Sequence, residues 1–298
     1  MSIIENAFRH SKKLKIDECE VVEVKKKIIT VRITDSEIVE IKQNFDENYG
    51  IRLVKDKKIA SIQTTDKKNI EKSIDDCFTT IKNLKSRKFW KGLPHKVTAK
   101  KLEGVFDEKL YNISGSNSMD IAQNMINSSN NEKVNTITGS LNIVSEVFKV
   151  VNSNGGDFEE KATYISGIIN AESEYGNIPV SGIGHASGRT LSNFSSEQIG
   201  NDAKTMCIKS INPQKIDSGN YSIIFEPYSV GELLAFVVAN NFNFKTFSEK
   251  KSCFSNKFNE KISTEQFNLI DDPHIPEGIG TKPIDDEGIE TKKNNIIE

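Results

Sequence analysis

The sequence has few of the residues that build metal clusters and disulfide frameworks. Only four Cys and four His occur among 298 residues. The cysteines lie too far apart for a Cys-x-x-Cys motif or a set of bridges, so we expect free and mostly buried thiols. No His-x-x-x-His or His-Glu-x-x-His spacing occurs, which excludes a zinc site carried on one helix. The residues concerned are Cys19, Cys77, Cys207, Cys253, His10, His95, His185 and His274.

Long apolar runs are also absent. The first fifteen residues contain no uninterrupted apolar segment, and no later run approaches the roughly 20 residues that a membrane-spanning helix needs. With 28% charged and 36% hydrophobic residues, the composition is that of a soluble globular chain. Its length is sufficient for two domains with a buried core. We therefore expect a cytoplasmic protein.

The formal net charge of -2 is unevenly distributed. Residues 1–101 hold 24 Lys and Arg against 15 Asp and Glu, whereas residues 102–298 hold 16 against 27. A basic half could meet nucleic acid, or the acidic half of its own or a partner chain. Much of the excess lies in short lysine clusters at expected turns, such as residues 25–27, where solvated lysines are common.

Two similar units are predicted in residues 1–212, at 1–84 and 116–210, joined by a linker at 85–115. In the first unit, Ser2 and Glu5 fit a capping box for a helix to about Lys13. Alternating apolar residues from Cys19 to Thr65 predict an antiparallel meander, and helical spacing from Ile70 to Leu84 predicts a second helix.

The second unit repeats this order of elements. A helix capped by Ser118 precedes long strands at 135–145 and 147–151, and the turn at 152–156 reverses the chain into a strand at 158–171. A helix capped by Ser195 follows. These patterns predict an α+β fold in which an N-terminal α/β domain contains two helix–antiparallel-meander–helix units. The alternative is that helices and hairpins alternate by chance, as in many α+β proteins.

Residues 213–298 follow a different pattern. Tyr221–Phe225 alternates like a half-buried strand, and Pro227 ends it because proline has no N–H to donate. Residues 230–239 are apolar on almost every side, which predicts a buried helix. Residues 262–270 are a further candidate strand, followed by a turn at Asp271-Asp272-Pro273.

Two polar segments contain candidate functional residues. The segment 182–188 resembles a glycine-rich phosphate loop but lacks its final spacing, so we expect a mobile surface loop. His185 and Arg189 there could contact a peptide carboxylate, because Arg offers a forked pair of donors; a purely structural pair is the alternative. An acidic cluster beside His274 could bind a hard metal ion or simply form turns. Its members are Asp271, Asp272, Asp285, Asp286 and Glu287.

Several stretches, in order along nearly the whole chain, are similar to those of the TldD/PmbA family, also called the modulator of DNA gyrase family. The stretches that carry this resemblance are Cys19 to Ile33, Tyr49-Gly50-Ile51-Arg52, Val151-Asn152-Ser153-Asn154-Gly155, Ser187-Gly188-Arg189, Ile199-Gly200, Lys250-Lys251-Ser252 with Phe254, Asp271-Asp272-Pro273-His274, Gly278-Ile279-Gly280, Asp285-Asp286-Glu287-Gly288 and Ile296-Ile297-Glu298.

The resemblance implies an α/β N-terminal domain, followed at 213–298 by the start of a β-rich C-terminal domain that is incomplete here. The active branch of the family carries a His-Glu-x-x-x-His zinc motif after the strand that ends the first region. Counted from Pro227, the positions of that motif hold Ala235, Phe236 and Asn240. None of these side chains replaces imidazole as a ligand or carboxylate as a base. The resemblance therefore implies no metal and no catalytic residue in this chain.

This departure from the motif resembles the PmbA (TldE) branch. It implies the zinc-free subunit of a heteromeric peptidase that acts on peptides, paired with a TldD-like partner that holds the zinc, or with a second copy of itself. The resemblance also implies a cleft-side role for Asp285, Asp286 and Glu287, and we place His185 and Arg189 in the same substrate cleft. Two other hypotheses remain open. One is an independent metallohydrolase that uses His185, His274 and the acidic cluster; the other is a gyrase-associated or nucleic-acid-binding module that uses the basic half.

Overall fold

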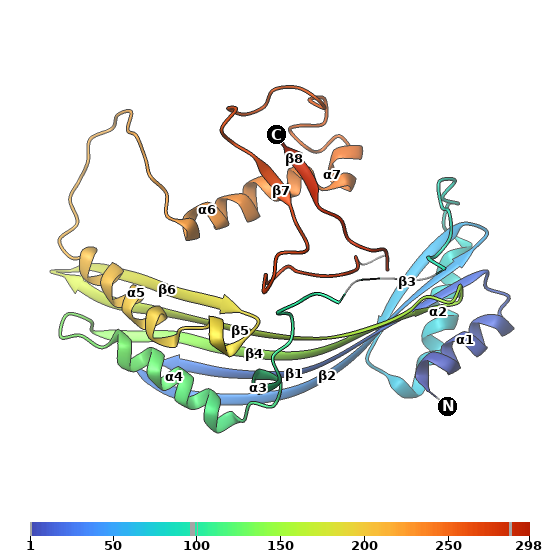
Figure 1. Cartoon of the computed structure of the whole chain (residues 1–298), viewed down its shortest axis with the longest axis horizontal. Coiled ribbons are helices and arrows are strands. Elements are labelled where there is room, and N and C mark those ends of the chain that lie inside the picture. The colour runs from blue at the N-terminus through green and yellow to red at the C-terminus, as the bar shows by residue number, and fades with distance from the viewer. Residues whose placement is uncertain (1, 96–98, 100, 286–287) are drawn as a thin grey trace. The chain divides into compact units, whose positions relative to one another are not determined.

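The computed structural model describes residues 2–95, 99, 101–285 and 288–298 (Figure 1). The chain divides into two compact units. The first contains residues 1–213 and 273–291, and the second contains residues 214–272 and 292–298. Because the chain returns from the second unit to the first, the segment 273–291 belongs with the large N-terminal sheet. None of the described helices is long and apolar enough to cross a lipid bilayer.

The first unit is built on one antiparallel sheet of six long strands (Figure 1). The strand order is β3-β2-β1-β4-β5-β6, so β1 and β4 join the two predicted units at the centre. The α+β fold with two units in one sheet is thereby confirmed. The strands are β1 (Glu18–Thr34), β2 (Glu37–Lys55), β3 (Lys58–Thr64), β4 (Thr136–Asn152), β5 (Asp157–Tyr175) and β6 (Ile178–Gly188).

The described helices of this unit pack on one face of the sheet. They form two groups, and each group has its own hydrophobic core. One core joins the first half of the sheet to α1 and α2, and includes Val21, Leu53 and Ile74. The other joins the second half to α3, α4 and α5, and includes Leu141 and Ile169. The helices are α1 (Ile3–Lys13), α2 (Ile70–Lys82), α3 (Glu108–Tyr111), α4 (Gly115–Ser129) and α5 (Ser196–Lys209).

Specific hydrogen bonds fix the start of α1 and the position of the linker. Ser2 accepts a hydrogen bond from the amide of Glu5, and the Glu5 carboxylate accepts one from the amide of Ser2, which is the predicted capping box. In the linker, Trp90 donates from Nε1 to the Glu18 carboxylate at 2.7 Å. The same carboxylate accepts from the amide of Leu93 and the side chain of Asn154. The linker is thus tied to the start of β1.

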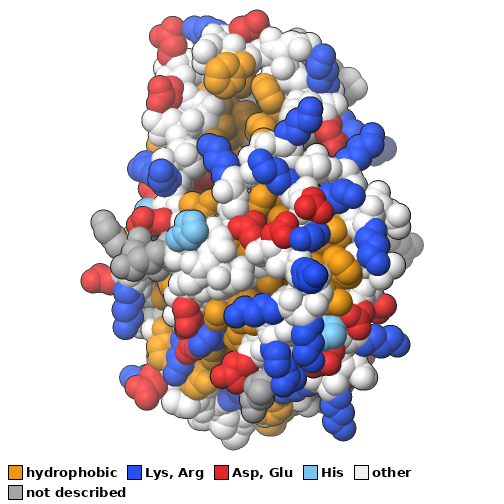
Figure 2. All heavy atoms as spheres, turned by 90° about the vertical axis from the view of Figure 1, so that its right-hand side faces the viewer, with side chains coloured by type: hydrophobic (Ala, Val, Ile, Leu, Met, Phe, Trp, Pro, Cys, Tyr) orange, Lys and Arg blue, Asp and Glu red, His pale blue; other side chains and the backbone are white. Residues whose placement is uncertain are grey.

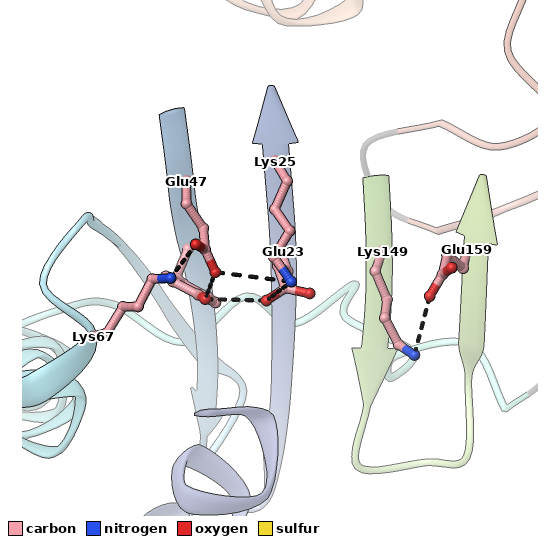
Figure 3. Close-up of polar contacts among 7 residues, drawn as sticks. Glu23, Lys25, Glu47, Lys67, Lys149 and Glu159 are labelled. Atoms are coloured by element: carbon pink, nitrogen blue, oxygen red, sulfur yellow. Dashed lines mark hydrogen bonds and ion pairs between the residues drawn. The ribbon is translucent and has the colours of Figure 1, made fainter. Parts of the chain in front are cut away.

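A polar network separates the two cores on the helix-bearing face (Figure 3). Tyr49 donates its hydroxyl to Glu23 at 3.0 Å and also hydrogen-bonds Glu47. Lys25 pairs with Glu23 at 2.9 Å, and Lys67 pairs with Glu47. Burial raises the pKa of the Tyr49 hydroxyl, and its two carboxylate acceptors raise it further, so this tyrosine acts as a neutral donor.

The structure corrects the prediction for residues 182–188. They form the C-terminal half of β6 rather than a mobile loop. The glycines hid the strand, because Gly182 and Gly184 occupy every second position but carry no side chain to show the alternation. An added Cβ at Gly184 would lie 1.9 Å from the carbonyl oxygen of Ile199 on α5. Glycine is required here because the helix backbone lies directly on the strand.

The second unit differs from its predictions at three places. Tyr221–Phe225 is not a strand, and of residues 262–270 only the end contributes to β7 (Leu269–Asp271), which pairs with β8 (Asn294–Ile297). The predicted helix at 230–239 is helical but not buried, since Phe236 is 78% exposed. The helical segments are α6 (Pro227–Leu233), a π-helix at Leu234–Val238 and a 3-10 helix at Ala239–Phe242, with α7 (Phe244–Ser248) after them. An apolar pattern thus identified a helical segment but not its burial.

Candidate functional site

The face of the sheet opposite the helices, here called the helix-free face, carries polar side chains that no sequence motif identified. On β1 this face presents Lys26, which pairs with Glu146 of β4 at 2.8 Å. On β5 it presents Glu160 and Tyr164. These side chains alternate with the residues that face the helices, as the pleat of a strand requires.

Residues 281–285 of the segment 273–291 lie against this helix-free face. They and the strand residues Glu146, Glu160 and Tyr164 line a small hollow of about 40 Å³. Ile284 is 3% exposed and anchors the segment. The hollow is large enough for about one water molecule or one small polar group.

Arg189 holds this segment in place. Its guanidinium donates to the carbonyl oxygens of Gly278, Ile279 and Thr281 at 3.1, 2.9 and 2.8 Å. It also lies 4.0 Å from the centre of the Tyr164 ring. Arg189 is only 1% exposed, so these contacts form in a dry environment where charge-assisted hydrogen bonds are strong.

Burial shifts the titration of the groups around the hollow. Burial raises the pKa of Glu160, and the charge of Arg189 opposes that shift without cancelling it. Burial likewise raises the pKa of the Tyr164 phenol. The Tyr164 hydroxyl can donate or accept a hydrogen bond, and the Glu160 carboxyl adds acceptor oxygens beside it.

The predicted cleft residues occupy different places on this face. His185 is exposed on β6, opposite Ile168 of β5. Arg189 follows four residues later, which corresponds to about 13 Å along a strand. Asp285 lines the hollow and accepts from the amide of Ile289, so its carboxylate also shapes a turn. The structure thus brings Arg189 and Asp285 to one region and leaves His185 farther along β6.

Two further predicted cleft residues, Asp286 and Glu287, lie outside the described residues. Among the residues that sequence reasoning missed, Glu160 and Tyr164 line the hollow directly. No local pattern identifies them, because Glu160 lies in a run of three charged residues and the buried pair Ala162 and Thr163 interrupts the alternation along β5.

The positions of the family zinc motif do not fit zinc. Ala235 and Phe236 lie in the π-helix, Asn240 lies in the following 3-10 turn, and all three are exposed. A methyl group and a phenyl ring have no lone pair for a metal, and zinc sites are built from Cys, His, Asp and Glu. In the described ranges, no three or more of those residues gather where they could hold a metal ion.

The residues of the independent-hydrolase hypothesis are dispersed. His274 hydrogen-bonds Thr291 at 3.1 Å in the first unit. Asp272 pairs with Lys293 at 3.0 Å in the second unit. His185 is on β6. His274 and Asp272 thus each contact a different residue near the end of the chain.

Lysine and arginine side chains do not gather in one patch on the face shown in Figure 2. Lys and Arg side chains are spread over that face and are interrupted by Asp and Glu. Several lysines have acidic partners, as in the pair of Lys55 with Asp17 at 2.7 Å and that of Lys26 with Glu146. Ion pairs of this kind reduce the charge available to a phosphate backbone.

The six-stranded antiparallel sheet, the helices on one of its faces and the segment that returns to it define an α+β protein. Residues 19–80 match the model of PmbA/TldA metallopeptidase domain 1, and residues 218–298 match the model of the PmbA/TldA metallopeptidase C-terminal domain. The chain belongs to the PmbA/TldD family.

The chain is also similar to individual proteins and solved structures. An uncharacterized protein of Methanocaldococcus jannaschii is 24% identical over 94% of this chain. A putative modulator of DNA gyrase from Thermotoga maritima superposes on 99% of the chain with a TM-score of 0.88 and 21% identity. TldE from Thermococcus kodakarensis superposes on all of it with a TM-score of 0.82 and 20% identity. The chain spans 64% of the length of the first of these relatives and 68% of each solved chain.

Proposed function

We propose that this chain is the zinc-free, TldE/PmbA-like subunit of a heteromeric metallopeptidase that degrades peptides in the cytoplasm. The observation that carries the proposal is the replacement of the zinc motif by Ala235, Phe236 and Asn240 within a chain of this family. A TldD-like partner supplies the zinc and the water that it activates. This chain contributes binding surface rather than a catalytic residue.

The helix-free face is the part of this chain that we assign to the substrate. Arg189 fixes the segment 273–291 against the sheet, so the hollow beside Glu160 and Tyr164 keeps its shape. Exposed polar side chains such as His185 extend the same face along β6. An extended peptide matches such a surface, because it presents donors and acceptors at the spacing of a strand.

The proposal predicts that activity requires two different chains. The purified chain, a TldD-like protein from the same genome and their mixture would be assayed on the same unstructured peptides. We expect no cleavage by this chain alone and faster cleavage by the mixture than by the partner alone, with complete loss after chelation. A mixture whose partner lacks its zinc motif is the matched control. Chelator-sensitive cleavage by this chain alone would overturn the proposal.

A further inference from the structure

The helix-bearing face of the sheet has an open groove that the proposed function does not use. Its volume is about 520 Å³, which is within the range of small-molecule sites. It lies over the middle of β1, β2 and β4, where the two hydrophobic cores are separate. We call it the Phe45 groove. The lining residues that matter here are Lys25, Lys27, Phe45, Glu47, Tyr111 and Ser145.

Two rows of side chains form the floor of the Phe45 groove. Lys27 of β1 is in register with Phe45 of β2 and with Ser145 of β4. Lys25 of β1 is in register with Glu47 of β2, in the next row on the same face (Figure 3). Rows on one face of a sheet are two residues apart, which is about 7 Å along a strand. Charged groups of opposite sign therefore lie in neighbouring rows.

Two aromatic rings line the same groove. Phe45 is 73% exposed. Tyr111 of α3 is held above β4, because Ser145 donates its hydroxyl to the Tyr111 carbonyl oxygen at 3.4 Å. The Tyr111 ring lies 5.4 Å from the ring of Phe106 and 5.8 Å from Nζ of Lys161. A fixed ring and an exposed ring beside one hollow favour a ligand that is itself aromatic.

Both a cation and an anion are available to a ligand in this groove. Nζ of Lys27 donates to the carbonyl oxygen of Ile113 at 2.8 Å, a neutral acceptor, and an ammonium group has three donors. Burial opposes ionisation of Glu47, but hydrogen bonds from Lys67 and Tyr49 outweigh it and hold the pKa of the carboxyl below its usual range. Glu47 is therefore a carboxylate at neutral pH.

We propose that the Phe45 groove binds a free amino acid with an aromatic side chain. The carboxylate of the amino acid pairs with Lys27, its ammonium group pairs with Glu47, and its ring packs on Phe45 and Tyr111. A free amino acid carries both charges on one α-carbon, which suits partners in adjacent rows. The proposal does not depend on the peptidase function.

Two other ligand classes fit less well. The charged ends of a dipeptide are farther apart by up to about 3.6 Å, the length of one extended residue. A nucleotide presents a planar ring with negative charge only, and Glu47 repels that charge. The presence of both signs of charge thus favours a zwitterion.

Titration calorimetry of the full chain with L-phenylalanine tests this proposal. We expect saturable binding. N-acetylphenylalanine has no ammonium group and phenylalanine amide has no carboxylate, so each should bind about tenfold more weakly. Phenylalanylglycine should also bind more weakly than phenylalanine, and adenosine monophosphate should not compete with it.

Substitutions place the binding in the groove. Phe45→Ser and Lys27→Gln should each weaken the binding of phenylalanine about tenfold. Phe89→Ser is the matched control, because Phe89 is 76% exposed in the linker. Circular dichroism establishes that each variant is folded.

Any of four results would overturn the proposal. They are a wild-type chain that does not bind phenylalanine saturably, equal binding of N-acetylphenylalanine or phenylalanine amide, unchanged affinity in Phe45→Ser or Lys27→Gln, and a preference for another ligand class. That preference would appear as tighter binding of phenylalanylglycine or as competition by adenosine monophosphate.

Discussion

Replacing Arg189 with methionine is expected to lower the free energy of unfolding by about 3 kcal/mol, because three carbonyl acceptors lose their donor in a site closed to water. The stacking on Tyr164 is lost as well. For a chain of this length the change corresponds to a fall in Tm of about 6 °C. Arg189→Lys should recover part of the loss, since an ammonium group donates but lacks the planar fork.

Thermal and urea unfolding measure this effect, and hydrogen exchange locates it. The amides of residues 278–281 should exchange faster in Arg189→Met than in the wild type. Arg9→Met is the matched control, because the Arg9 side chain is 48% exposed and its pair with Glu71 is at the surface. Equal stability of the two variants would show that Arg189 does not hold the segment.

Gly184→Ala is expected to destabilise the first unit by about 3 kcal/mol, near the upper end of the usual cost of overpacking. The new methyl group would lie 1.9 Å from the carbonyl oxygen of Ile199 and 2.7 Å from the amide nitrogen of Ala203. Both are backbone atoms of α5, so relief requires the whole helix to move away from β6. Chemical denaturation, followed by the circular dichroism of the helices, measures the loss.

Gly280→Ala is the control for this substitution. An added Cβ at Gly280 meets no atom within 4 Å. Its effect should be small, because the new methyl group meets no other atom and alanine restricts the unfolded chain only modestly more than glycine does. If Gly184→Ala unfolds at the same denaturant concentration as Gly280→Ala, then α5 does not rest on β6 as described.

Elements defined by local patterns were predictable from the sequence. The capping box at Ser2 gives the start of α1, and Asn152 to Gly156 gives the turn between β4 and β5. These signals involve residues a few positions apart. The strands at 135–145 and 147–151 are one strand, β4, because Glu146 faces Lys26 across the ladder instead of interrupting it.

Features that depend on distant contacts were not predictable. Arg189 holds carbonyl groups about 90 residues later in the chain, and no local pattern connects the two. The residues of the hollow come from β4, β5 and the segment 273–291, which meet only in the folded sheet. The zinc-motif positions were assigned by resemblance, because an alanine, a phenylalanine and an asparagine carry no positive signal of a lost site.

The account depends most on the claim that this chain has no zinc site of its own. Elemental analysis of the chain purified alone, with neither metal nor chelator added, tests it most directly. We predict well under one zinc per chain, and no gain after incubation with zinc and dialysis. One zinc per chain that survives dialysis, and that is lost in His185→Ala or His274→Ala, would contradict the account.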